Sequence, residues 1–114
     1  MAITGIGGLF FRSVDSKALA AWYKTHLGID WSWEPQAGPT LVVPFAQDTD
    51  YFPAGKQFMV NFRTDDIDAE IARLRAAGIE VITKAEWDTP ETGRFGRIHD
   101  PEGNAIELWQ PPAE

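Results

Sequence analysis

The chain has 114 residues, 44% of them hydrophobic and 24% charged, which predicts a single domain over residues 1–114 with a core of its own. Its formal charge of −7 disfavours nucleic acid as a partner, because an acidic surface repels a phosphate backbone, whereas a cationic small molecule would be attracted. The absence of cysteine excludes disulfides, thiolate nucleophiles and cysteine metal sites.

Neither a membrane location nor export is expected from the sequence. No stretch approaches the ~20 apolar residues that a membrane helix needs. The opening MAITGIGGLFF lacks a basic segment followed by a long apolar one. We therefore expect a cytoplasmic protein that binds neither nucleic acid nor membrane.

Two helices are expected, one in each half of the chain. The first is SKALAAWYKTHLG at 16–28, which Asp15 or Ser16 can cap and which Gly28 ends. The second is IDAEIARLRAAG at 67–78, which Asp65 or Asp66 can cap. Apolar residues at helical spacing form one stripe on each: Leu19, Trp22, Tyr23 and Leu27 on the first, and Ile67, Ile71 and Leu74 on the second.

The chain repeats itself around these helices. FFRSVD at 10–15 aligns with NFRTDD at 61–66, an offset of 61 − 10 = 51 residues, and each segment leads into a helix. The repeat predicts two modules, at about 3–54 and 55–111. The strands expected in the first are 7–12, 31–34 and 40–45, with a further candidate at 48–52, and those expected in the second are 57–64, 80–83, 94–99 and 105–109.

The segment HDPEGNAIELWQ at 99–110 predicts a hairpin. Its three-residue loop PEG has Gly103 placed for a left-handed conformation, so that Asp100 opposes Asn104. Continuing this register predicts an ion pair between Arg97 and Glu107, because oppositely charged residues on neighbouring strands commonly pair. The other predicted pairs are His99 with Ala105 and Phe95 with Trp109.

These segments resemble the vicinal oxygen chelate superfamily, which groups glyoxalase I, bleomycin and fosfomycin resistance proteins, methylmalonyl-CoA epimerases and extradiol dioxygenases. The resemblance lies in FFRSVD leading into AAWYKTHLGI, in DDIDAEIARLRAAGI and above all in DPEGNAIELW. It implies an α+β fold of two tandem βαβββ modules, which form a curled mixed sheet around a cleft, the glyoxalase/bleomycin resistance/dioxygenase fold. It also implies a homodimer, in which the cleft walls come from one chain or from both.

The resemblance further implies a divalent metal in the catalytic members, held by His, Gln or Glu on the first strand of each module and by Glu on the last strand. Glu107 matches the last-strand position, but the first-strand positions fall on Gly8 and Met59. A glycine offers no ligand, and a thioether does not suit such oxygen and nitrogen sites. Gln47 is the only polar candidate for a fourth ligand. We therefore expect no metal and no other cofactor, with Glu107 as the ligand if a metal binds after all.

Aromatic and polar residues on the same strand faces indicate a small-molecule cleft. The alternative for the aromatics is core packing. Glu107 and His99 are the candidate catalytic residues; for Glu107 we favour a residue paired with Arg97, and for His99 a role in the turn. The predicted ligand-binding residues are Phe10, Arg12, Trp33, Met59, Asn61, Arg97, Glu107 and Trp109, with Phe95 also lining the cleft.

The expected function is binding of a small, partly aromatic molecule without the customary metal. The alternative is a metal-dependent lyase, isomerase or dioxygenase of the same superfamily that uses Glu107. A metal-independent enzyme working through Glu107 or His99, and a dimeric subunit without a ligand, also stay open. The sequence leaves undecided which molecule binds and whether any reaction is catalysed.

Overall fold

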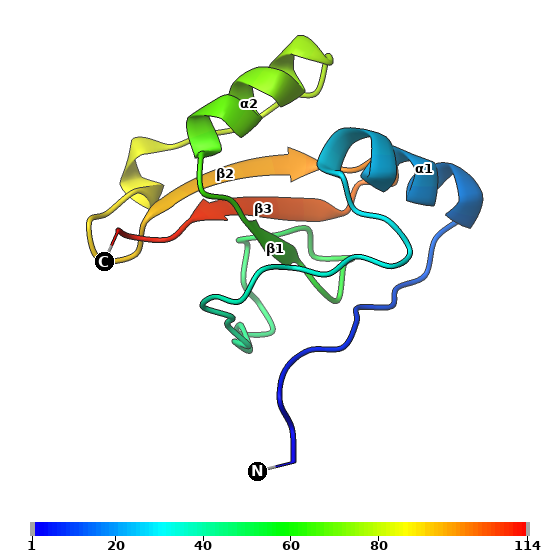
Figure 1. The fold of residues 1–114 in the computed structure, drawn as a ribbon, viewed down its shortest axis with the longest axis horizontal. Helices are drawn as coiled ribbons and strands as arrows, with labels where there is room; N and C mark the ends of the chain where they lie inside the picture. The colour runs from blue at the N-terminus through cyan, green and yellow to red at the C-terminus, as the bar shows by residue number, and fades with distance from the viewer. Residues whose placement is uncertain (1, 114) are drawn as a thin grey trace.

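The computed structural model describes residues 2–113, which fold into an α+β arrangement of two α-helices, one short 3₁₀ helix and a three-stranded mixed sheet (Figure 1). The elements in chain order are α1 (Ser16–Leu27), β1 (Val60–Arg63), α2 (Ile67–Ala76), η1 (Ala85–Trp87), β2 (Arg94–His99) and β3 (Ala105–Gln110). None of the helices between residues 2 and 113 is long and apolar enough to cross a lipid bilayer.

Both predicted helices form, and aspartates begin them. The side chain of Asp15 accepts a hydrogen bond from the Ala18 amide at 3.1 Å, and Gly28 ends α1 with φ of 69°. This left-handed conformation suits glycine because glycine has no Cβ. Asp66 caps α2 through the Ala69 amide, also at 3.1 Å.

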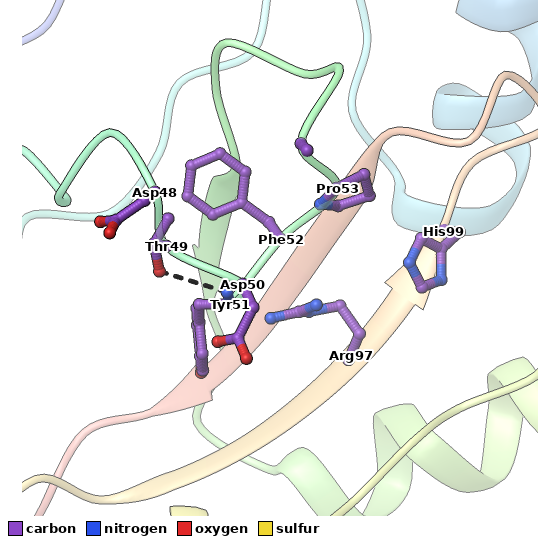
Figure 2. A pocket seen from close by; sticks show the side chains of 9 residues that line it. Asp48, Thr49, Asp50, Tyr51, Phe52, Pro53, Arg97 and His99 are labelled. Carbon is purple, nitrogen blue, oxygen red and sulfur yellow. Dashed lines mark hydrogen bonds between the residues drawn. The ribbon is translucent and has the colours of Figure 1, made fainter.

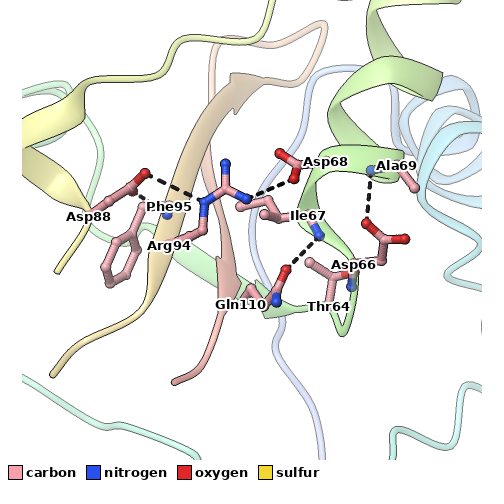
Figure 3. Close-up of polar contacts among 9 residues, drawn as sticks. All are labelled: Thr64, Asp66, Ile67, Asp68, Ala69, Asp88, Arg94, Phe95 and Gln110. Carbon is pink, nitrogen blue, oxygen red and sulfur yellow. Dashed lines mark hydrogen bonds and ion pairs between the residues drawn. The ribbon is translucent and has the colours of Figure 1, made fainter. Parts of the chain in front are cut away.

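The N-terminus of α2 is tied to the sheet by polar contacts (Figure 3). Gln110 on β3 accepts a hydrogen bond from the Ile67 amide at 2.9 Å. Arg94 on β2 lies 2.9 Å from an oxygen of Asp68 and 3.6 Å from one of Asp88. The Arg94 hydrogen bond lowers the pKa of Asp68. Asp68 is largely exposed and Arg94 and Asp88 are partly exposed, so these contacts orient the helix more than they stabilise it.

The sheet has the order β1-β3-β2, with β1 parallel and β2 antiparallel to β3. The predicted hairpin is confirmed: the Asp100 amide donates to the Asn104 carbonyl at 3.0 Å, and Gly103 has φ of 79°. All three predicted pairs of opposing residues are confirmed as well. The helices lie over one face of the sheet, and the coil between α1 and β1 passes over the other (Figure 1).

The core lies between the helices and the sheet. Four apolar side chains are fully buried there, namely Ile67, Leu74, Ile98 and Ile106. From α1, Leu19 and Tyr23 join the same cluster. Predicted stripes on both helices therefore face the core, because burying them removes apolar surface from water.

The hairpin loop holds α1 in place. Buried Asp100 accepts a hydrogen bond from the Tyr23 hydroxyl at 2.8 Å. Burial and this bond raise the pKa of Tyr23 well above its usual range. The carboxylate of Glu102 accepts from the backbone amides of Val14 at 2.8 Å and Asp15 at 3.1 Å. The loop thus fixes both the start and the inner face of α1.

The first half of the chain differs from the prediction. Between residues 2 and 59 no segment pairs as a strand, and 80–83 contributes one isolated bridge, from Ile82 to Arg97. An extended segment becomes a strand only beside another segment that satisfies its backbone groups, and this half of the described chain offers none. The predicted strands that do not form are 7–12, 31–34, 40–45 and 48–52 in the first half and 80–83 in the second, and the predicted strand 57–64 is shortened to β1. The tandem-module arrangement therefore stays a prediction.

Candidate functional site: a polar row on the open face of the sheet

Three polar side chains stand side by side across the sheet, on the face away from the helices. The register places Asn61 on β1 and Arg97 on β2 opposite Glu107 on the central strand β3. The neighbouring residues in each strand point to the core, because side chains alternate between the two faces. Alternation therefore creates a polar row beneath the coil that leads to β1.

Glu107 is buried and uses both of its carboxylate oxygens. Its Oε1 accepts a hydrogen bond from the side-chain amide of Asn61 at 2.8 Å, and its Oε2 accepts one from the Tyr51 hydroxyl. Burial, together with this bond to a carboxylate, raises the pKa of Tyr51 to about 12. Glu107 thus acts as an acceptor that holds the loop around Tyr51 against the sheet.

The predicted ion pair between Arg97 and Glu107 is not formed, although the two residues are opposite each other. Arg97 instead places its guanidinium against two aromatic rings, with Cζ 4.9 Å from the ring centroid of Tyr51 and 5.7 Å from that of Trp87. A guanidinium is attracted to the face of an aromatic ring, and Glu107 already has two other donors. Register decides which residues oppose; it does not decide how their side chains turn.

A shallow depression of about 520 Å³ opens beside Arg97, between β2 and the loop of residues 48–54 (Figure 2). The guanidinium of Arg97 points toward this loop, and His99 lies at the far end of the same strand. The exposed carboxylates of Asp48 and Asp50 also line the depression. Among the described residues, His99 has no hydrogen-bonded or ionic partner that would fit it for proton transfer.

The other predicted ligand-binding residues are dispersed. Phe10 is 87% exposed and Arg12 is exposed too, both in the coil before α1. Trp33 packs edge-on against Phe62, with ring centroids 5.9 Å apart. Met59 is half-buried immediately before β1. The structure therefore brings Asn61, Arg97 and Glu107 together and leaves these four residues outside their cluster.

Trp109 lies on the same face of the sheet as the polar row, but its ring packs against other residues of the chain. Its ring stacks on that of Phe95, with centroids 6.3 Å apart and planes 8° from parallel. Its indole Nε1 donates to the Thr92 carbonyl at 2.7 Å. This pair flanks the row, two residues along β2 and β3 from Arg97 and Glu107.

Two residues of the cluster were missed by the sequence analysis. Tyr51 lies in 48–52, which was a further strand candidate, and Trp87 lies in the polar loop KAEWDTPETG at 84–93, where no strand was predicted. Their rings pack edge to face, with ring centroids 6.1 Å apart, and both rings contact the guanidinium of Arg97. A tryptophan within an otherwise polar loop is the signal that could have found Trp87, because such a large apolar ring needs a surface to pack on.

The residues around Glu107 do not fit a divalent metal. Both neighbours of its carboxylate, Tyr51 and Asn61, are hydrogen-bond donors that use up its oxygens. Within residues 2–113, no three His, Asp or Glu side chains lie close enough to share an ion. Metal sites of this chemistry need several oxygen or nitrogen ligands, which the described residues around Glu107 do not supply.

Comparison with known proteins places the chain in a family. Residues 8–109 match the model of the glyoxalase-like domain. TnmS3, an antibiotic-binding protein from Streptomyces sp. CB03234, is 31% identical and has a TM-score of 0.59; the match covers 97% of this chain and 98% of that one.

A second solved structure shows the same fold at lower identity. It is a member of the glyoxalase/bleomycin resistance protein/dioxygenase superfamily from Sphaerobacter thermophilus DSM 20745, 20% identical, with a TM-score of 0.64 over 96% of this chain and 99% of that one. No curated protein matches the chain. The family-model match and these neighbours confirm the resemblance: the chain belongs to the glyoxalase-like domain family of the vicinal oxygen chelate superfamily.

Proposed function

We propose that this protein binds a small, partly aromatic molecule on the open face of its sheet, without a catalytic metal. The observation that carries the proposal is the cluster in which Tyr51 and Trp87 flank the guanidinium of Arg97 beside an open depression. Aromatic side chains with a few convergent polar groups are typical of small-molecule sites. The likeness to an antibiotic-binding protein over almost the whole chain supports the same function.

The cluster suits a flat ligand. The indole of Trp87 is half-buried and offers a surface for stacking, while Asn61 and Arg97 supply hydrogen-bond donors along the sheet. The site contains no arrangement of nucleophile and base, and Glu107 is engaged by Tyr51 and Asn61. Binding is therefore better supported than turnover.

A pair of tryptophan variants tests this proposal. We would screen aromatic antibiotics of different charge by thermal shift and measure the affinity of each compound that raises Tm. Trp87→Ala should weaken binding at least about tenfold, since a stacked aromatic contributes on the order of 1 kcal/mol or more. The matched control is Trp22→Ala, because Trp22 is also half-buried but lies on α1, over the other face of the sheet, and its loss should leave affinity unchanged. Equal effects of the two variants would contradict the proposed site.

We also propose that the protein is a homodimer. All large apolar side chains that are markedly exposed lie between Ile3 and Phe58, in the half without strands. Monomeric proteins rarely leave so much apolar surface in water, and the free edge of β1 can accept another strand. A second copy can cover this surface and supply the missing pairing partners, which would complete the two modules.

Sedimentation equilibrium at micromolar concentration tests the dimer. The expected mass is twice the 12.7 kDa of one chain. Val42→Asp, at an exposed apolar position, should shift the equilibrium to the monomer because it places a charge in the proposed interface. The control is Lys17→Asp, which introduces the same charge at an exposed position of α1. A monomeric wild-type chain would overturn the proposal.

A further inference from the structure

The guanidinium of Arg97 is buried without a complete set of partners. The residue is 7% exposed, and its Nε and Nη2 atoms are buried with no hydrogen-bond acceptor in reach. Buried polar groups in native proteins are nearly always paired, and an unpaired charged donor costs more than a neutral one. A position of this kind indicates an acceptor that arrives from outside the chain.

The surrounding side chains explain why the protein itself does not supply that acceptor. The rings of Tyr51 and Trp87 contact the guanidinium with their faces, and neither Nε nor Nη2 has a hydrogen-bond partner among the described residues. Glu107 directs its oxygens to Tyr51 and Asn61. Within residues 2–113, no carboxylate oxygen forms an ion pair with Arg97 at 4.0 Å or less. The cation is therefore held by aromatic rings, and its Nε and Nη2 donors remain unpaired within the described chain.

The direction of Arg97 fits a ligand site. Its side chain extends from β2 toward the loop of residues 48–54 and lines the depression there (Figure 2). Asp48 and Asp50 on the same lining are exposed, so water screens their repulsion of an anion. The Nε and Nη2 donors of Arg97 are buried, so water does not screen their attraction for an anion. Among the residues that line the depression, the buried charge is the positive one of Arg97, although the chain as a whole is acidic. Glu107 is buried as well, but its two oxygens already accept hydrogen bonds from Tyr51 and Asn61.

We infer that Arg97 anchors a planar oxyanion carried on the aromatic ring of the bound molecule, a carboxylate or an equivalent ionised oxygen. A guanidinium presents its donors in one plane and matches two acceptor oxygens in that plane. Tyr51 and Trp87 then contact the ring system of the ligand next to that anchor. This inference rests on the proposed function and adds the chemical class of ligand to it.

Three naphthalene probes of nearly the same shape test the charge preference by calorimetry: 2-naphthoate, 2-naphthalenemethanol and 2-naphthylmethylammonium. The wild-type protein should bind 2-naphthoate at least about tenfold more tightly than the neutral alcohol, which is the scale of one charge-assisted hydrogen bond. The ammonium probe, which the net charge of the chain would favour, should bind most weakly.

Variants of two arginines on one strand complete the test. Arg97→Met should abolish the preference for 2-naphthoate and change the affinity for the alcohol little, and Arg97→Lys should retain only part of the preference because it loses the planar donors. Arg94→Met, at an exposed position of β2, should leave the preference intact. Circular dichroism verifies that each variant is folded.

The outcomes separate the two proposals. Equal binding of the acid and the alcohol, tighter binding of the ammonium probe, or a preference that survives in Arg97→Met would overturn the anchor while leaving small-molecule binding in place. If none of the probes binds at millimolar concentration, the anchor is overturned as well, and the aromatic site of the proposed function loses its support.

Discussion

The two halves of the chain carry related sequences and adopt different structures. The segment NFRTDD contributes to β1 and leads into α2, and its apolar neighbours are packed against the sheet. The related segment FFRSVD leads into α1 but forms no strand, and its first two residues, Phe10 and Phe11, are exposed. The difference teaches that a strand-forming pattern in the sequence is not sufficient to form a strand. The segment also needs a neighbouring segment that forms hydrogen bonds with its backbone N–H and C=O groups.

The second half obtains its neighbours locally. The loop at 101–103 turns β2 directly back along β3, so their pairing needs little loop closure. α2 then covers the apolar face that this hairpin creates. In the first half, 31–34 and 40–45 flank the turn PQAGP without pairing. We attribute this to the absence of a covering partner, which the proposed dimer would supply.

The largest effect that tests this contrast is expected from truncating a leucine in the second half. Leu74 on α2 is fully buried, so Leu74→Ala should lower the free energy of unfolding by about 3 kcal/mol through lost burial and a cavity. Urea denaturation measures the change. A loss below about 1 kcal/mol would show that the core of the second half is far less tightly packed than its burial indicates.

A somewhat smaller effect is expected at the contact between the halves. Asp100→Ala removes the acceptor of the Tyr23 hydroxyl and of the Glu102 amide. Leaving these donors unpaired should cost about 2 kcal/mol and loosen α1. Hydrogen exchange of the α1 amides would show the loosening, with α2 as the internal control. Unchanged protection of α1 would contradict the role of the hairpin loop.

The Tyr51 contact should contribute less, and its contribution should depend on pH. Tyr51→Phe removes one hydrogen bond to Glu107 and should cost about 1 kcal/mol at neutral pH. The pKa of Tyr51 is raised to about 12 in the folded chain from its usual 10. Because the folded state retains the proton more tightly, this contribution is complete below about pH 10 and is lost as the pH rises toward 12.

Denaturation curves at alkaline pH test this sign. Wild-type stability should fall more steeply than that of Tyr51→Phe across the window from about pH 10 to 12. Tyr23→Phe serves as a comparison, since the pKa of Tyr23 is raised in the same direction by burial and by Asp100. Parallel curves for the wild type and Tyr51→Phe would show that the hydroxyl does not bond Glu107 in solution.

The smallest effect is expected from the same truncation in the first half. Leu41 is 67% exposed, so Leu41→Ala should change the stability of the single chain by less than about 0.5 kcal/mol. Leu74→Ala and Leu41→Ala make the same change of residue, so the difference between their effects on stability reports the difference in burial. A destabilisation that grows with protein concentration would indicate that Leu41 is covered in the dimer and would sharpen the contrast between the halves.

The parts that the sequence predicts well are those with local signals. Aspartate caps and a final glycine locate α1, and the turn at Gly103 determines every opposing pair of the β2–β3 hairpin. The family resemblance was confirmed by a family-model match over residues 8–109. Each of these features depends on residues close together in the chain, so a pattern in one stretch contains most of the information needed.

The site was less predictable because its contacts join distant segments. The expected bond from Arg97 to Glu107 was replaced by one from Tyr51, which is 56 residues from Glu107 in sequence. Trp87 comes from a loop whose composition indicated only solvent exposure. Alternation along the strands correctly placed Asn61 and Glu107 on one face, but which loops cover that face depends on the whole fold.

The contact between Glu102 and the start of α1 spans 88 residues and affects how the chain can fold during synthesis. At a ribosomal rate of about 5–20 residues per second, α1 emerges roughly 4–18 s before the loop that holds it. During this interval the apolar stripe of the nascent helix has no sheet to cover it. The helix that comes first in the chain is therefore among the last to dock, and the hairpin at the end of the chain completes the fold.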